Sequence, residues 1–252
     1  MFEMILGIHS IEAVLKVRPQ CVKSIYCTDE GLSEFIKKTQ LNKSKIPNIQ
    51  ILAPHGLQER AKEYFRQLDL EPIRVPSQIF AITEPKLIYD LNDFKKSVSK
   101  TEKVKILALD NISDVHNGGA ILRTAAFYGF DFVLLPSDKT FGFTPSFYRI
   151  ASGSTEYLNL VRISSLPRAL TSLKEDGFHV IGLSEHAQDK LPRDLNYPKI
   201  ILVLGAEDVG LSNAVMRNID STFSITSRSP IKSLNVSAAA AIAMEMCFPI
   251  KA

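Results

Sequence analysis

The chain has 252 residues, of which 45% are hydrophobic, so it is long enough for one large domain or two ordinary ones with a real core. No apolar run reaches the ~18 to 20 residues needed to span a bilayer, and the N-terminal stretch MFEMILGIHS lacks the basic start of a signal peptide. Three cysteines without CxxC spacing or a histidine cluster argue against disulfides and against a metal site. We therefore expect a soluble cytoplasmic protein without membrane or metal partners.

The net charge of +3 is unevenly distributed. Residues 1–100 hold 15 basic and 12 acidic side chains, whereas residues 101–252 hold 15 of each. A weakly basic part next to a neutral part is typical of a polyanion-binding domain beside a catalytic one. A charge of this size is nevertheless ordinary for a soluble protein.

The first 80 or so residues alternate helical and strand patterns, which predicts a small α/β domain. The predicted helices are 10–17, 32–40 and 57–65, and the predicted strands are 22–26 and 49–52. Residues 87–103 lose the apolar periodicity and gather four lysines, which favours an exposed connector. We therefore predict a domain over 1–85, a linker over 86–103 and a second domain over 104–252.

The second domain is predicted to be a parallel α/β sheet. Its apolar runs at 104–109, 131–135, 179–183 and 200–204 are continuous, as in strands buried on both faces. Helical patterns at 119–128, 166–175, 213–217 and 233–246 lie between or after them, and Gly129 and Gly177 stand at C-cap positions of the first two. Alternating strands and helices are typical of a parallel sheet.

Three polar segments carry the candidate chemistry, and each also has an ordinary structural interpretation. Asn117-Gly118-Gly119 opens a helix and could let main-chain amides approach an anion, or it could be a plain βα turn. Arg123 sits among small and apolar neighbours in that helix, where a cation needs a partner or a phosphate.

The second segment, Gly205 to Ser212, follows the most hydrophobic strand and so lies at a carboxyl end of the sheet, where α/β folds bind ligands. Its acidic residues Glu207 and Asp208 disfavour a phosphate loop, and a turn with Ser212 as helix N-cap is the alternative. In the third segment, Ser233 and Asn235 flank Leu234 at a helix start, where they could be caps or could contact a ribose.

In this order, the three segments resemble the motifs of the SpoU/TrmH branch of the SPOUT RNA methyltransferases, and residues 4–15 resemble the start of the substrate-binding domain of the rRNA-type members. The resemblance implies transfer of a methyl group from S-adenosylmethionine to a ribose 2′-hydroxyl in RNA, most often 23S rRNA. It also implies a trefoil knot in the second domain and a homodimer. A tRNA target and a catalytically silent RNA-binding protein of the same fold remain the alternatives.

Carried over by position, the resemblance implies five polar site residues: Asn117, Arg123, Glu207, Ser233 and Asn235. It places Gly205, Ile225 and Leu234 where the family's backbone holds S-adenosylmethionine. Two departures are visible: Val115 stands where the family commonly has proline, and Ile225-Thr226-Ser227 stands where Ile-Pro-Met is common. A free arginine side chain has a pKa above about 12, so it stays protonated at neutral pH and is a poor general base. We therefore expect Arg123 to bind an RNA phosphate and stabilise the oxyanion that forms at the 2′-hydroxyl, with phosphate or water accepting the hydroxyl proton.

Overall fold

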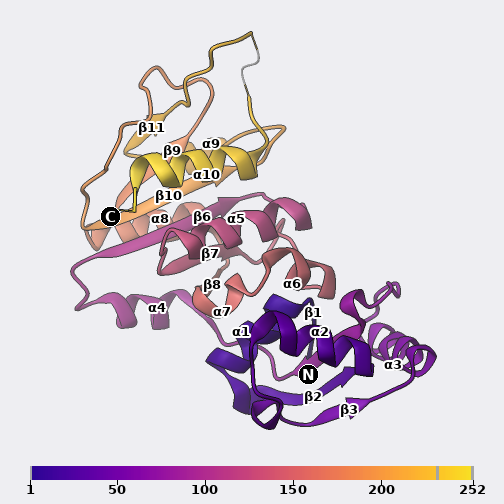
Figure 1. The fold of residues 1–252 in the computed structure, drawn as a ribbon. Coiled ribbons are helices and arrows are strands. Elements are labelled where there is room, and N and C mark those ends of the chain that lie inside the picture. Colours follow the sequence, from indigo (N-terminus) through magenta and orange to yellow (C-terminus); the bar gives the residue numbers. More distant parts are fainter. Residues whose placement is uncertain (1, 231–232, 251–252) are drawn as a thin grey trace. The chain divides into compact units, whose positions relative to one another are not determined.

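The computed structural model describes residues 2–230 and 233–250. The chain forms two compact units (Figure 1), and each is described separately. The smaller unit comprises Met1–Lys86 together with Phe143–Tyr157. The larger unit comprises Leu87–Gly142 and Leu158–Ala252.

The smaller unit is built on a four-stranded mixed sheet with the strand order β1-β4-β2-β3. Strands β2 and β3 are parallel, and β4 runs antiparallel to both β1 and β2. The predicted elements are present, and β1 and β4 are additional. The elements of residues 1–86 are β1 (Glu3–Leu6), α1 (Ile8–Val17), η1 (Pro19–Cys21), β2 (Val22–Cys27), α2 (Asp29–Thr39), η2 (Lys43–Lys45), β3 (Ile49–Ile51), α3 (Pro54–Gln67), η3 (Pro76–Gln78) and β4 (Ile79–Thr83).

Two short helices complete the smaller unit, although the chain reaches them only after three strands of the larger one. These are α6 (Pro145–Ala151) and α7 (Ser154–Tyr157). The Ser10 hydroxyl donates a hydrogen bond of 2.5 Å to the Tyr148 carbonyl, and Gly153, at φ 85°, leaves no room for a Cβ beside Ala13. The chain therefore passes between the two units three times, not once.

The larger unit is a seven-stranded sheet with the order β11-β9-β10-β6-β7-β8-β5, in which all pairings between neighbouring strands are parallel. This confirms the predicted parallel α/β class. Its strands are β5 (Ile88–Tyr89), β6 (Val104–Asp110), β7 (Phe132–Pro136), β8 (Asn159–Ile163), β9 (His179–Leu183), β10 (Lys199–Gly205) and β11 (Ser221–Phe223). Its helices are α4 (Leu91–Val98), α5 (Val115–Phe127), α8 (Leu166–Glu175), α9 (Asn213–Met216) and α10 (Val236–Cys247).

Helices cover both faces of this sheet. Alternate residues of β6 point to opposite faces: Ile106 and Ala108 share a core with α4 and α8, while Leu107 and Leu109 are buried on the other side. Helices α5 and α10 pack against each other, and α10 also contacts β10. Gly129 and Gly177, at φ 64° and 85°, follow α5 and α8 in the predicted left-handed conformation.

The stretch that we expected to be an exposed connector is instead folded. Residues 86–103 contain β5 and α4, and α4 buries Phe94 completely, with its ring 4.7 Å from that of Phe132. The lysines misled the prediction because Lys95 and Lys96 lie on a short amphipathic helix whose other side is buried, while Lys100 and Lys103 follow that helix. Phe94 therefore belongs to the core of the larger unit.

Candidate active site

The candidate site lies where two central strands end. Strands β6 and β10 pair in register, and Asp110 and Gly205 stand opposite each other at their last positions. The chain continues from Asp110 into α5, and from Gly205 into the loop that holds Glu207. Because the strands are parallel, both continuations leave the same edge of the sheet.

Three of the five predicted polar residues are brought together by hydrogen bonds at this edge. The Asn117 Nδ2 group donates to Glu207 Oε1 at 3.1 Å, and the Asn235 Nδ2 group donates to the same oxygen at 2.5 Å and to Asn117 Oδ1 at 3.0 Å. The main-chain amide of Val236 also donates to Glu207 Oε1, at 3.1 Å. One carboxylate oxygen thus joins residues that are 90 and 28 positions away in the sequence.

Asn235 also ends the loop before α10. Its Oδ1 accepts a hydrogen bond of 2.9 Å from the Ser237 amide, so the side chain is the N-cap of the helix. The helix begins at Val236, three residues later than the expected start at Ser233. The cap interpretation is therefore confirmed for Asn235, and the same side chain makes a second set of contacts, because its oxygen caps the helix while its nitrogen joins the network.

Ser233 does not enter this network. It lies exposed before the helix and makes no hydrogen bond within the described residues. Leu234 beside it is 49% exposed.

Arg123 is not enclosed by its apolar neighbours as we expected. The buried side of α5 carries Ile121, Leu122 and Ala125, whereas Arg123 is exposed. No carboxylate pairs with its guanidinium within 2–230 and 233–250. The prediction of an enclosed Arg123 was wrong because neighbouring residues of a helix point in different directions. A single cation among apolar residues in the sequence can therefore still point to solvent.

The glycines of Asn117-Gly118-Gly119 do not form an open anion cradle. Helix α5 begins at Val115, and the Asp114 side chain caps it by accepting from the Asn117 amide at 2.8 Å. Both glycines are buried in the helix, and a Cβ on Gly118 would lie 2.2 Å from the Phe141 ring. Gly118 thus makes room for an aromatic side chain next to Asn117.

Val115 occupies the first position of α5. Proline is favoured at that position because the amide there has no helical partner, and valine can occupy it as well. The departure from the family pattern therefore leaves the start of the helix intact.

The loop after β10 is closed tightly on itself. A Cβ on Gly205 would lie 2.3 Å from the Gly210 carbonyl carbon, and the Gly210 amide donates to the Ala206 carbonyl at 2.9 Å. Gly205 is therefore required by the loop's own backbone. Ser212 caps α9, accepting from the Val215 amide, so the structural alternative for this residue is confirmed.

Asp110 is a residue of this edge that the sequence reasoning missed. It is only 5% exposed, and its Oδ2 accepts a hydrogen bond of 2.7 Å from the Ser212 amide. A carboxylate at the last position of a buried strand was the available signal. Ile225, predicted to contact the cofactor, lies half-buried two residues beyond β11.

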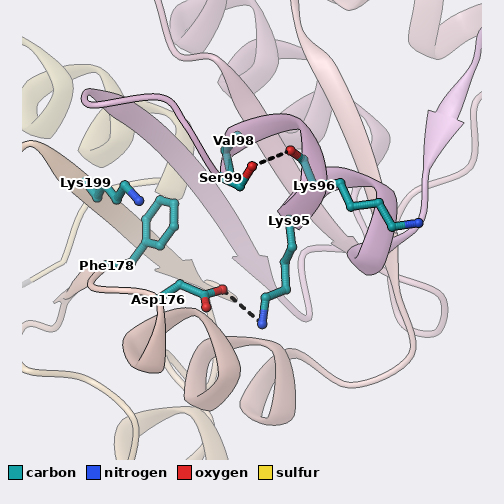
Figure 2. Close-up of a pocket in the computed structure, with 7 residues that line it drawn as sticks. All are labelled: Lys95, Lys96, Val98, Ser99, Asp176, Phe178 and Lys199. Atoms are coloured by element: carbon teal, nitrogen blue, oxygen red, sulfur yellow. Dashed lines mark hydrogen bonds and ion pairs between the residues drawn. The ribbon is translucent and has the colours of Figure 1, made fainter.

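A separate hollow of about 470 Å³ lies elsewhere on the larger unit (Figure 2). Lys95 bonds Asp176 at 2.9 Å beside it, and the Lys199 ammonium lies 5.5 Å from the centre of the Phe178 ring. Phe178 directly precedes β9 and Lys199 begins β10, so this hollow belongs to the amino ends of the strands. None of the predicted site residues lines it.

Two of the three cysteines, Cys27 and Cys247, are buried. Burial raises the pKa of Cys27 to about 11 and that of Cys247 to about 12, which disfavours the reactive thiolate at neutral pH. Among the described residues, no group of three or more His, Cys, Asp or Glu side chains could hold a metal ion. No helix in the same residues is long and apolar enough to cross a membrane.

The chain is similar over almost its whole length to known RNA methyltransferases. The 23S rRNA (guanosine-2'-O-)-methyltransferase RlmB of Pseudomonas putida is 30% identical over 244 residues, covering 96% of this chain and 94% of its own. Its Escherichia coli K12 counterpart is 28% identical, with 97% of both chains covered. The fold is similar to that of the SpoU methyltransferase AviRb from Streptomyces viridochromogenes, solved in complex with AdoMet, with a TM-score of 0.73. The two sequences are 21% identical, and the match covers 96% of this chain and 88% of the AviRb chain. The model of the SpoU rRNA Methylase family matches residues 105–245, and the chain belongs to this family.

Proposed function

We propose that the protein transfers the methyl group of S-adenosylmethionine to the 2′-hydroxyl of a guanosine ribose in 23S rRNA. The observation that carries the proposal is the hydrogen-bonded group of Asn117, Glu207 and Asn235, which joins the three family motifs at one edge of the sheet. The named activity of the relatives that match almost the whole chain supports the choice of substrate. With an rRNA substrate, we also propose that the enzyme acts in the cytoplasm.

We propose that the loops around Gly205, Ile225 and Leu234 hold the cofactor. Glu207, Asp208 and Val209 are exposed, and their main-chain amides donate no hydrogen bond within the described residues, so these amides are available to a ligand. Val209 is 73% exposed and Leu234 is 49% exposed, which suits contact with an apolar purine surface. When bound, the cofactor supplies an electrophilic methyl group on a positively charged sulfur.

The chain's own residues have to align the ribose hydroxyl and stabilise the charge that develops on it. The Arg123 guanidinium is exposed and lacks a carboxylate partner in the described part of the chain, so it is free to bind a phosphate of the RNA. We assign it that phosphate contact and the stabilisation of the oxyanion. An RNA phosphate or a water molecule takes the hydroxyl proton.

The network of Asn117, Glu207 and Asn235 has a positioning role in this proposal. By sharing one Glu207 oxygen, it fixes the start of α5, the loop after β10 and the start of α10 relative to one another. We assign Ser233 a contact with the ribose or the RNA backbone, because its exposed hydroxyl is not used within the described residues. Substitution of each residue, followed by measurement of methyl transfer, tests both roles.

We further propose a homodimer built on the outer sides of α5 and α10, and a trefoil knot in the larger unit. Phe127 on α5 is 70% exposed and Ile242 on α10 is 37% exposed, and these two helices pack against each other. Covering such side chains is the usual source of dimer stability. In the same proposal, residues 1–85 recognise RNA, which the excess of three positive charges over residues 1–100 favours.

The test is methyl transfer in vitro followed by mapping in cells. Purified protein is incubated with labelled S-adenosylmethionine and either 23S rRNA fragments or tRNA, and the modified nucleotide is located by its resistance to alkaline cleavage. One 2′-O-methylguanosine should appear in 23S rRNA and be absent from the RNA of a strain that lacks the gene. Methylation of tRNA alone would replace the proposed target, and absence of S-adenosylmethionine binding in calorimetry would favour a silent RNA-binding protein.

A further inference from the structure

The buried carboxylate of Asp110 stands directly beneath the candidate site. Asp110 is the last residue of β6, and it faces Gly205 across the strand pair. At 5% exposure it is nearly removed from water, which is costly for an ionised side chain without compensating bonds. The polar groups that surround it therefore indicate what the charge is used for.

Its two oxygens are divided between two donors. Oδ2 accepts from the Ser212 main-chain amide at 2.7 Å, and Oδ1 accepts from the Asn111 Nδ2 group at 3.0 Å. No lysine, arginine or histidine of the described segments pairs with Asp110. Hydrogen bonds to an ionised acceptor are shorter and stronger than neutral ones, and 2.7 Å fits that class.

The Ser212 amide is the far end of the loop that begins at Gly205. Ser212 is also the N-cap of α9, so it marks the point where the loop enters a helix. The loop's near end is set by β10, which pairs with β6 along its whole length. Asp110, at the end of β6, therefore lies opposite Gly205 at the start of the loop and bonds Ser212 at its end. Glu207 lies between these two loop residues.

We propose that Asp110 is a positioning residue for methyl transfer, which holds the loop from Gly205 to Ser212 in the shape that binds the cofactor and presents Glu207 to Asn117 and Asn235. The inference rests on the proposed function. Asp110 acts through Ser212 and does not touch the reacting atoms. Both carboxylate oxygens are needed, because an asparagine amide would offer one acceptor oxygen to two donors and would set its own NH2 group against the other donor.

The variant Asp110→Asn tests this assignment with little change in volume. We expect the dissociation constant for S-adenosylmethionine to rise about tenfold or more, as for loss of a hydrogen bond to a charged group. The single-turnover rate at saturating cofactor should also fall by about tenfold, because Glu207 is then less well placed. A residue that supports only the fold would lower the melting temperature and leave both quantities unchanged.

Asp131→Asn is the matched control. The Asp131 Oδ2 accepts from the Lys105 main-chain amide, also at 2.7 Å, but at the amino end of β6 and on an exposed residue. This variant should keep cofactor affinity and turnover. Equal losses in both variants would overturn the specific role of Asp110, as would unchanged affinity and turnover in Asp110→Asn.

Amide hydrogen exchange in the unmodified protein provides a measurement that does not depend on a folded variant. The Ser212 amide should exchange far more slowly than the amides of Asp208 and Val209, which lack an acceptor within the described residues. Equally fast exchange would overturn the proposal. The cofactor dissociation constant and the amide exchange need only cofactor and protein, so a failure of RNA methylation would count against the proposed function and leave these two tests of Asp110 intact.

Discussion

The two units of the chain use their polar side chains in opposite ways. In the smaller unit, Arg18 is 8% exposed and bonds Glu156 through Nε at 2.8 Å and through Nη2 at 3.1 Å, with Glu3 as a second carboxylate at 3.1 Å. In the larger unit, Asn117, Glu207 and Asn235 bond one another but remain accessible. The buried cluster has little bonding capacity left, whereas the accessible one can still meet a ligand, so we assign the first to the stability of the fold and propose that the second serves a site.

The buried cluster has a topological task. Glu156 lies on α7, and Arg18 follows α1, so their ion pair joins segments 138 residues apart. Burial opposes the charge on Arg18, but the bonds to Glu156 and Glu3 outweigh it and raise the pKa of the guanidinium. This pairing binds the inserted helices to the smaller unit.

The largest expected effect follows from removing the smaller unit. A chain that begins at Lys103 loses α4, and with it the buried Phe94, and it leaves Phe147, Tyr148 and Glu156 without the groups that bury them. We expect aggregation and no cooperative unfolding transition. A chain that begins at Leu87 and replaces residues 143–157 with a flexible linker of equal length should fold and bind S-adenosylmethionine.

If the chain that starts at Lys103 folds with normal cofactor affinity, α4 is dispensable and the inserted helices do not need the groups of residues 1–86 that bury them, so the contrast between the units is weaker than we argue. Circular dichroism and calorimetric titration with the cofactor decide the outcome. RNA affinity and its salt dependence in the chain that begins at Leu87 then test the assignment of RNA recognition to residues 1–85.

The next effect concerns the stability of the fold, which the buried Arg18–Glu156 pair should affect without a role in methyl transfer. Glu156→Ala leaves the buried Arg18 charge partly unpaired and should lower the free energy of unfolding by about 3 to 5 kcal/mol. Glu63→Ala is the control, because the Arg60–Glu63 pair has the same 2.8 Å distance but is exposed, and its loss should cost about 0 to 1 kcal/mol. Urea unfolding measures both, and similar losses in the two variants would contradict the structural role of the buried pair.

Arg123 should show the reverse behaviour, a large loss of activity with little loss of stability. Arg123→Ala should lower methyl transfer by about 10² at saturating cofactor, which corresponds to about 2.7 kcal/mol of transition-state stabilisation. Arg123→Lys should recover little, because an ammonium cannot make the planar two-pronged contact with a phosphate. The assay counts labelled methyl groups in 23S rRNA, and near-normal turnover in the alanine variant would end the catalytic assignment.

The sequence predicted the parallel sheet well because its strands are continuous apolar runs and its glycines mark helix ends. It failed where burial depends on distant partners. Phe94 looked like part of a lysine-rich connector, since the ring that it meets, Phe132, belongs to a strand 38 residues later. Glu156 and Arg18 could not be matched either, because no local pattern reports that a segment after β7 returns to the first unit.

The same limit applies to the site. Asn117, Glu207 and Asn235 were named through their motifs, and the structure supplies the shared oxygen that joins them. The interpretation of Gly118 as an anion cradle was wrong because its close neighbour, Phe141, is 23 positions away. Asp110 was missed because a single carboxylate at a strand end carries no spacing signal until its partner, the Ser212 amide, is located.

The smallest expected effect tests whether the accessible cluster acts as one unit. Asn117→Ala removes one donor to Glu207, and Asn235→Ser removes another while keeping a side chain suited to the N-cap of α10. Each should lower methyl transfer by roughly three- to tenfold, and the double variant should lose less than the product, with a coupling of at least about 0.5 kcal/mol, since either change already loosens Glu207. Asn159→Ala, which removes an exposed amide bonded to the Asp131 carbonyl at 3.1 Å, is the control and should leave activity unchanged. Losses that simply multiply would show that the two asparagines act independently, and the cluster would then be three separate residues that happen to lie within hydrogen-bond distance.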